Sequence, residues 1–136
     1  LCSPAVELST KAARAALPES VPHRDAVFNG AHAALLVAAL TTGRYDVLRT
    51  AMADRLHQPY RAPLIPGLER ALAAAGEAGA CGACLSGAGP TALALCRDEA
   101  TAERAAGLMQ QAFAAAGLTS GARVVRPRAR GAEVLV

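Results

Sequence analysis

A short glycine-rich run is the first segment of this sequence that could do chemistry. It reads Ser86-Gly87-Ala88-Gly89-Pro90 and lies between two short apolar runs. Glycine permits positive φ and lets backbone N–H groups approach a ligand, so successive N–H groups in such a turn can bind an anion. A plain tight turn is the competing interpretation. The run matches neither the Walker-type phosphate loop, which needs a following Lys and Ser or Thr, nor the dinucleotide fingerprint, which needs a third glycine opening a helix.

The cysteines suggest a metal or redox site, but their spacing does not favour one. Cys81 and Cys84 have the spacing of half a zinc site, and Cys96 with a distant histidine makes a poor second half. A redox pair of the thioredoxin type opens a helix after a strand, whereas this pair falls inside a predicted strand. We therefore predict small buried thiols and no metal site.

Two carboxylates and one histidine are candidates for acid–base chemistry. Asp25 falls in the first turn of a predicted helix, where a carboxylate interacts favourably with the helix dipole. We expect structural roles for Asp25 and Asp54, and packing against Tyr60 for His57. No catalytic residue is assigned.

Composition limits the class of protein. The 136 residues are 53% hydrophobic and 18% charged, which is enough for the core of one domain and excludes intrinsic disorder. The 35 alanines favour closely packed helices. Nucleic-acid binding is disfavoured because aromatic residues are only 3% and the net charge is only +3.

The location of the protein is predicted from its apolar segments. The longest apolar run, 33–40, is too short to span a membrane, and the sequence as given opens without a leader. We therefore expect a cytoplasmic protein with reduced thiols.

The elements that must position these residues follow from apolar periodicity and from glycine and proline. Helices are predicted over 11–17, 22–42, 45–57, 68–78 and 99–115, with an irregular, proline-rich stretch over 58–67. Strands are predicted over 1–8, 80–85, 91–96, 123–126 and 132–136, and the glycine run joins two of them as a hairpin. Clustered strands favour an α+β fold, with an antiparallel sheet of about four strands and helices packed on one side. Residues 1–136 are predicted to form a single domain.

The glycine run belongs to a longer string that carries a family resemblance. Residues 85–95, LSGAGPTALAL, closely resemble the third, carboxyl-terminal motif of the GHMP small-molecule kinases. Two further segments, 13–29 and the string DRLHQPYRAPLIPG over 54–67, are similar to the homoserine kinase branch of that family. The resemblance covers nearly the whole chain. It implies the fold of the carboxyl-terminal, substrate-side domain of these kinases.

The activity that the resemblance implies is transfer of the ATP γ-phosphoryl group to the side-chain hydroxyl of L-homoserine, in threonine biosynthesis, with Mg²⁺. The family's Pro-x-x-x-Gly-Leu-Gly-Ser-Ser-Ala motif and His-x-x-Asn segment belong to the amino-terminal half and do not occur here. The resemblance thus implies a missing ATP-binding half that holds the ATP and Mg²⁺ ligands. We expect this chain alone to be inactive, and apolar surface left by the missing half would favour a homodimer.

Site residues are also implied by the resemblance. It places a substrate arginine at Arg61 and a second one on a strand near the carboxyl terminus, with Arg126 as the best match and Arg123 as the alternative. Guanidinium groups suit this task because they bind a carboxylate in a planar, bidentate way. The glycine loop, Ser86 to Pro90, would help to shape the substrate and phosphate site.

Two alternatives stay open. One is a non-catalytic amino-acid-binding or regulatory module that keeps the same fold. The other is the corresponding half of another GHMP kinase, such as one of the isoprenoid pathway, which the string over 58–67 disfavours.

Overall fold

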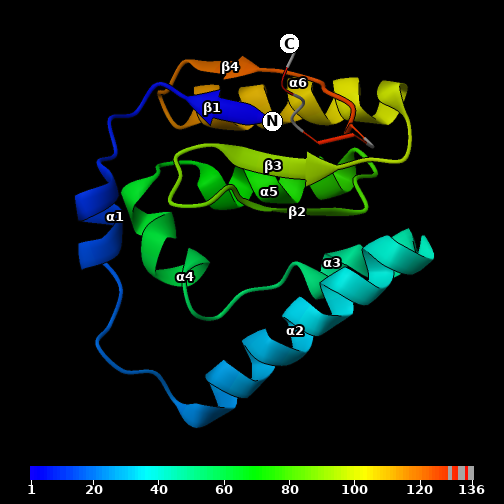
Figure 1. Ribbon diagram of the computed structural model, residues 1–136. Coiled ribbons are helices and arrows are strands. Elements are labelled where there is room, and N and C mark those ends of the chain that lie inside the picture. Colours follow the sequence, from blue (N-terminus) through cyan, green and yellow to red (C-terminus); the bar gives the residue numbers. More distant parts are fainter. Residues whose placement is uncertain (129, 132–133, 135–136) are drawn as a thin grey trace.

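A computed structural model describes residues 1–128, 130–131 and 134 (Figure 1). Its elements, in chain order, are β1 (Cys2–Pro4), α1 (Thr10–Ala15), α2 (His23–Thr42), the 3-10 turn η1 (Tyr45–Val47), α3 (Leu48–Ala51), α4 (Gln58–Arg61), the 3-10 turn η2 (Ala62–Leu64), α5 (Leu68–Glu77), β2 (Gly82–Leu85), β3 (Ala92–Leu95), α6 (Glu99–Ala115) and β4 (Ser120–Ala122).

The four strands form one antiparallel sheet in the order β2-β3-β1-β4. Helices α5 and α6 lie together on one face of this sheet, α5 behind β2 and β3 and α6 behind β1 and β4 (Figure 1). The predicted α+β class and the four-stranded antiparallel sheet are confirmed.

The core fills the space between the sheet and the two helices. Its largest buried side chains are Phe113, Met109, Leu68 and Ile65, each at most 1% exposed, and alternate strand residues join them, with Ala83 and Leu85 from β2 and Ala92 and Ala94 from β3. Side chains alternate between the faces of a strand. The core of the sheet is therefore on its α5–α6 side.

Gly82 faces the opposite side of the sheet, and α3 packs there. A Cβ atom at Gly82 would lie 2.5 Å from the Met52 sulfur and 3.0 Å from the Leu48 carbonyl oxygen. Only glycine permits this approach, because any side chain would meet backbone. The short helix α3 is thereby held against β2, and the segment that follows it enters the functional site.

Capping residues define two of the helices. The Ser9 hydroxyl accepts a hydrogen bond from the Ala12 N–H at the start of α1, and the Asp98 carboxylate accepts one from the Thr101 N–H at the start of α6. Gly43 ends α2 with a φ of 71°, the left-handed conformation that glycine adopts without strain.

Several predicted boundaries were wrong. The helix over 45–57 is broken, because α3 ends at Ala51 and the following residues turn toward α4. The stretch 58–67 is not wholly irregular, since Pro59 stands in the first turn of α4, where a missing N–H costs nothing. The strand predicted over 123–126 forms three residues earlier, as β4. The strand predicted over 1–8 is shorter and comprises only β1. The strand predicted over 132–136 lies largely outside the described residues.

Helix α2 stands apart from the sheet and its two helices (Figure 1). Of its twenty residues only Ala39 is buried, while Val27, Val37 and Leu40 are about half exposed. Among the described residues, no helix has the length and hydropathy that crossing a bilayer requires.

Candidate functional site

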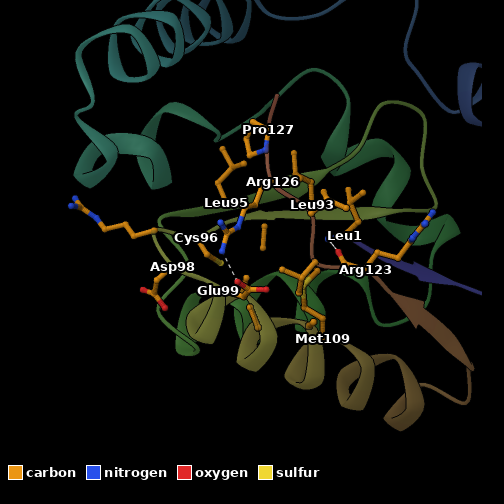
Figure 2. A pocket seen from close by; sticks show the side chains of 17 residues that line it. Leu1, Leu93, Leu95, Cys96, Asp98, Glu99, Met109, Arg123, Arg126 and Pro127 are labelled. Atoms are coloured by element: carbon orange, nitrogen blue, oxygen red, sulfur yellow. Dashed lines mark hydrogen bonds and ion pairs between the residues drawn. The ribbon is translucent and has the colours of Figure 1, made fainter. Parts of the chain in front are cut away.

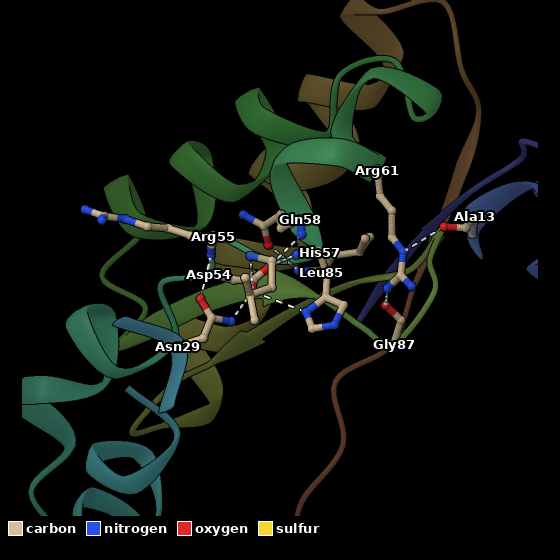
Figure 3. A network of polar contacts seen from close by, with 10 residues as sticks. Ala13, Asn29, Asp54, Arg55, His57, Gln58, Arg61, Leu85 and Gly87 are labelled. Atoms are coloured by element: carbon tan, nitrogen blue, oxygen red, sulfur yellow. Dashed lines mark hydrogen bonds and ion pairs between the residues drawn. The ribbon is translucent and has the colours of Figure 1, made fainter. Parts of the chain in front are cut away.

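Arg61 is the centre of the candidate site. It is the last residue of α4 and is only 9% exposed. Its Nε donates a hydrogen bond to the Ala13 carbonyl at 3.2 Å, and its Nη1 donates one to the Gly87 carbonyl at 3.0 Å (Figure 3). The guanidinium therefore connects α1 with the glycine loop, and these two bonds fix its orientation.

The charge of Arg61 has no acidic partner in the described part of the chain. No carboxylate oxygen there lies within 4 Å of its guanidinium nitrogens. A guanidinium has five N–H donors, and the two carbonyls use only two of them. A cation this buried is unfavourable unless an anion or further acceptors complete its shell. The remaining donors are suited to a carboxylate, which a guanidinium can bind with two parallel hydrogen bonds.

The glycine loop lies directly beside this arginine. Gly87 and Gly89 both have positive φ, 57° and 89°, and the peptide bond between Gly89 and Pro90 is cis. The Gly89 N–H donates to the Ser86 carbonyl at 3.0 Å, which closes the turn. Within the described residues the N–H groups of Gly87 and Ala88 donate to no other group. They are the backbone donors that this loop offers to a ligand.

Gly89 also places the loop on the core. A Cβ atom there would lie 2.9 Å from Ile65 Cδ1 and 3.1 Å from Leu85 Cδ1. Gly87 differs, since nothing lies within 4 Å of its would-be Cβ. One glycine thus permits close packing, and the other leaves space in front of the loop.

Helix α4 is attached to the hairpin at both of its ends. The Gln58 Oε1 accepts a hydrogen bond from the Leu85 N–H at 2.8 Å, just before the glycine loop, and Arg61 reaches Gly87 within it (Figure 3). Because both bonds run between α4 and one turn, the position of the guanidinium relative to the loop is fixed on two sides.

Asp54 organises the turn that leads into α4. Its carboxylate accepts hydrogen bonds from the Leu56 N–H at 3.0 Å, the His57 N–H at 2.8 Å and the Gln58 N–H, and also from the Asn29 side-chain amide. Burial opposes ionisation of Asp54, but these hydrogen bonds outweigh it and lower its pKa to about 2. A carboxylate so engaged is a structural anion and a poor base.

The network around Asp54 also attaches α2. The Asn29 Oδ1 accepts a hydrogen bond from the Arg55 N–H at 2.8 Å, and the Arg55 guanidinium lies 3.9 Å from the centre of the Phe28 ring. Arg55 further donates to Asp25 at 3.3 Å. These contacts explain why Asp25 and Asn29 face the body of the protein.

The other chemistry-bearing residues are peripheral to Arg61. His57 is half exposed, and its ring lies 3.3 Å from the Asp54 carboxylate. All four cysteines are free thiols, and burial together with the negative charge of Asp54 raises the pKa of Cys84. Among the described residues, no group of three or more His, Cys, Asp or Glu side chains is arranged to hold a metal ion.

The structure does not bring the two predicted substrate arginines together. Arg126 is exposed and donates to the Glu99 carboxylate at 2.7 Å, at the end of β3 that leads into α6. Arg61 reaches the opposite end of β3, where the glycine loop enters it. Arg123 is exposed as well, and its backbone pairs with Leu1. Within the described residues the guanidinium groups of Arg61 and Arg126 therefore lie at opposite ends of β3, and the substrate role of Arg126 stays a prediction.

Sequence reasoning missed the residues that hold Arg61 in place. These residues make contacts with residues far away in the sequence, which no local sequence pattern predicts; they are Gln58, Asn29 and Ala13 with its carbonyl group. A local signal did exist for Asp54, since an aspartate four residues before Gln58-Pro59 is typical of a turn that caps a helix start.

Comparison with known proteins places this arrangement in a family. Residues 36–115, more than half of the chain and including both Arg61 and the glycine loop, match the family model described as GHMP kinases C terminal. The chain belongs to the GHMP kinases. Residues 36–115 thus correspond to the carboxyl-terminal part of that family, as the string over 85–95 predicted.

Three proteins that are similar to this chain carry the name homoserine kinase. A homoserine kinase from Gloeobacter violaceus is 60% identical over 95 residues, which are 70% of this chain and 32% of that protein. A homoserine kinase from Moorella thermoacetica is 44% identical over 132 residues, which are 97% of this chain and 44% of that protein. The crystal structure of homoserine kinase from Cytophaga hutchinsonii superposes with a TM-score of 0.84 at 33% identity and covers 88% of this chain and 38% of that one. The chain spans less than half the length of these relatives.

Proposed function

We propose that this chain is the acceptor-side, carboxyl-terminal part of a homoserine kinase. The observation that carries the proposal is the guanidinium of Arg61, which is buried, oriented by two carbonyls and without an acidic partner in the described residues. L-Homoserine is a zwitterion whose carboxylate matches that group in charge and geometry. The names of the relatives support the same choice of acceptor.

In this proposal, the side-chain hydroxyl oxygen of L-homoserine attacks the γ-phosphorus of ATP. A new O–P bond forms, the bond from the γ-phosphorus to the bridging oxygen breaks, ADP leaves and the hydroxyl proton is released. Arg61 binds the carboxylate and so orients the hydroxyl. Phosphoryl transfer depends mainly on such alignment and on charge stabilisation. We assign no base, because the carboxylate of Asp54, which is partly buried, is engaged by hydrogen bonds.

Among the described residues, no group of three or more His, Cys, Asp or Glu side chains is placed to hold a metal ion, and Asp54 is already surrounded by N–H donors. We therefore place ATP and Mg²⁺ on the amino-terminal part of the complete enzyme. The unpaired N–H groups of Gly87 and Ala88 would face that nucleotide from the acceptor side. We also assign the complete enzyme to threonine biosynthesis in the cytoplasm.

The test uses the protein encoded by the complete reading frame that contains this chain. It is incubated with ATP and Mg²⁺ and with L-homoserine, mevalonate or galactose, and the products are followed by ³¹P NMR. We expect a phosphate monoester on L-homoserine alone. Phosphorylation of another acceptor would redirect the proposal to another GHMP kinase.

The same experiment separates the enzyme from a non-catalytic module. Calorimetric binding of L-homoserine without any product would identify an amino-acid-binding module. The 136-residue chain by itself serves as the negative control, and we expect it to form no product.

A further inference from the structure

Figure 2 shows a cavity of about 770 Å³ beside the end of β3 that leads into α6. Arg61 contacts the glycine loop at the opposite end of β3. One wall is β3 and the residue after it, Leu93 to Cys96, and the opposite wall is the extended segment from Arg123 to Pro127. The floor is α6, which contributes Ala102, Ala105, Ala106 and Met109. Leu1 closes one end. We refer to this cavity as the strand slot.

One wall of the strand slot is the edge of β3 and the other is the segment 123–127, and both carry backbone groups without a backbone partner. Strand β1 separates β3 from β4 but pairs with β3 only at Cys2, opposite Ala92. Beyond that pair, within the described residues, the backbone groups of Cys96 and Val125 make no backbone hydrogen bond. Unpaired edges facing each other across a gap are suited to one further strand.

The register of β1 against β3 and β4 shows which residues would lie in the strand slot. Cys2 lies opposite Ala92 in β3 and opposite Ala122 in β4, and both pairings are antiparallel. The Leu1 and Arg123 backbones exchange two hydrogen bonds, of 2.9 and 3.0 Å, so the pairing continues one residue past β4. In an antiparallel pair, the residue one position earlier in β1 lies opposite the residue one position later in β3 and in the segment that follows β4. The first, second and third residues ahead of Leu1 therefore fall opposite Ala94, Leu95 and Cys96 on one side and opposite Val124, Val125 and Arg126 on the other.

We infer that the strand slot is filled by the residues immediately preceding Leu1 in the complete protein, which extend β1 between β3 and the segment 123–126. The inference rests on the proposed function only in that the protein continues ahead of Leu1, as relatives more than twice as long as this chain suggest. About four residues at 3.3 Å each would cover the slot. The extension would turn the short β1 into the central strand of the sheet.

Side-chain alternation specifies the chemistry of the inserted segment. Cys2 and Pro4 face the core, whereas Leu1 and Ser3 are exposed. The first and third residues ahead of Leu1 therefore face α6, where the floor is alanine and methionine, and must be small or apolar. Reading the codons ahead of Leu1 checks this directly. Charged residues at both positions would overturn the inference.

The structural test follows amide hydrogen exchange by NMR in the complete protein. In an antiparallel ladder the residues of one strand bond alternately to the left and right neighbours. The N–H groups of Ala94, Cys96 and Val125 then face the inserted strand, and we expect them to exchange roughly 100-fold or more slowly than exposed loop amides. Exchange of these three at loop rates, while the Leu93 amide facing β2 stays protected, would overturn the inference. Phosphoryl transfer is not measured, so the result is independent of the kinase proposal.

A matched pair of variants of the complete protein sharpens the test. Ala106→Glu places a carboxylate in the floor of the strand slot, whereas Ala114→Glu adds the same charge on an exposed turn of the same helix. We expect at least roughly tenfold faster exchange at Ala94, Cys96 and Val125 in A106E and no change in A114E. Equal protection in the two folded variants would contradict the inference. If A106E does not fold, the exchange rates of Ala94, Cys96 and Val125 in the unaltered protein still test whether a strand fills the slot.

Discussion

Two regions of this chain differ in how much of their apolar surface they cover. The body, formed by the sheet with α5 and α6, encloses Phe113, Met109, Leu68 and Ile65 almost completely. Helix α2 is also rich in apolar residues, yet Ala39 is its only buried residue. The exposed residues between 26 and 41 are Ala26, Val27, Gly30, Ala31, Ala33, Ala34, Val37, Ala38, Leu40 and Thr41.

At 100° per residue these ten positions form one continuous side of α2 without a single charge. Solvent-facing helix surfaces are ordinarily polar. The body therefore has its core within the chain, whereas α2 packs mainly on α3 and η1 and is attached by polar and ring contacts at Asn29, Phe28 and Asp25. The site lies where the two regions meet, because Asp54 connects α2 to the turn that precedes α4.

The largest expected effect tests the difference directly. Phe113→Ala should lower the free energy of unfolding by about 3–5 kcal/mol, because it opens a cavity in the body. Val37→Ala removes a side chain that is 62% exposed and should change it by less than about 0.5 kcal/mol. Urea denaturation of both variants measures this. Similar losses would mean that α2 is covered as completely as the body.

The next effect separates two glycines of one loop. Gly89→Ala combines a left-handed φ with contacts to Ile65 and Leu85 and should cost about 2–3 kcal/mol. Gly87→Ala meets open space and should cost about 1 kcal/mol, from its positive φ alone. Denaturation midpoints of the two variants, compared at equal m-value, would show the order. The reverse order would mean that the loop does not rest on the body.

Asp54→Asn tests the connection between the regions. An amide that presents an N–H group to N–H donors should lower the free energy of unfolding by about 1–3 kcal/mol at pH 7. The pKa of Asp54 falls from 3.8 when unfolded to about 2 when folded, so its contribution is complete above about pH 4. It is lost as the pH falls from 4 toward 2, and the stability difference from D54N should shrink over that window. A difference that is constant with pH would exclude this role of the carboxylate.

The sequence predicted the body better than the connection, for a physical reason. Apolar periodicity and the positions of glycine and proline are local signals, and they place α6 and the hairpin correctly. The ends of β1 and β4 are set by pairing partners, and the break after Ala51 is set by the approach of α3 to Gly82, which are contacts between distant residues. Arg61 was predicted by resemblance. Its restraint by Ala13, Gly87 and Gln58 is tertiary and was not predictable.

The smallest expected effect concerns Arg126. Its ion pair with Glu99 is exposed, and such pairs contribute roughly 0–1 kcal/mol. Arg126→Ala should therefore scarcely change stability. The same variant of the complete enzyme tests the predicted substrate role: removal of the second substrate arginine should raise the KM for L-homoserine, whereas a KM within about twofold of the unaltered enzyme would leave Arg126 with the Glu99 ion pair alone.

The central claim is that the Arg61 guanidinium binds the carboxylate of the acceptor. The direct measurement compares the complete enzyme with its Arg61→Ala variant on two acceptors, L-homoserine and L-homoserine amide, which lacks the negative charge. Loss of a charge-assisted pair of about 2–3 kcal/mol should raise the KM for L-homoserine roughly 30- to 150-fold. The KM for ATP and the KM for the amide should stay nearly unchanged. An equal rise for both acceptors, or an equal rise for ATP, would contradict the account.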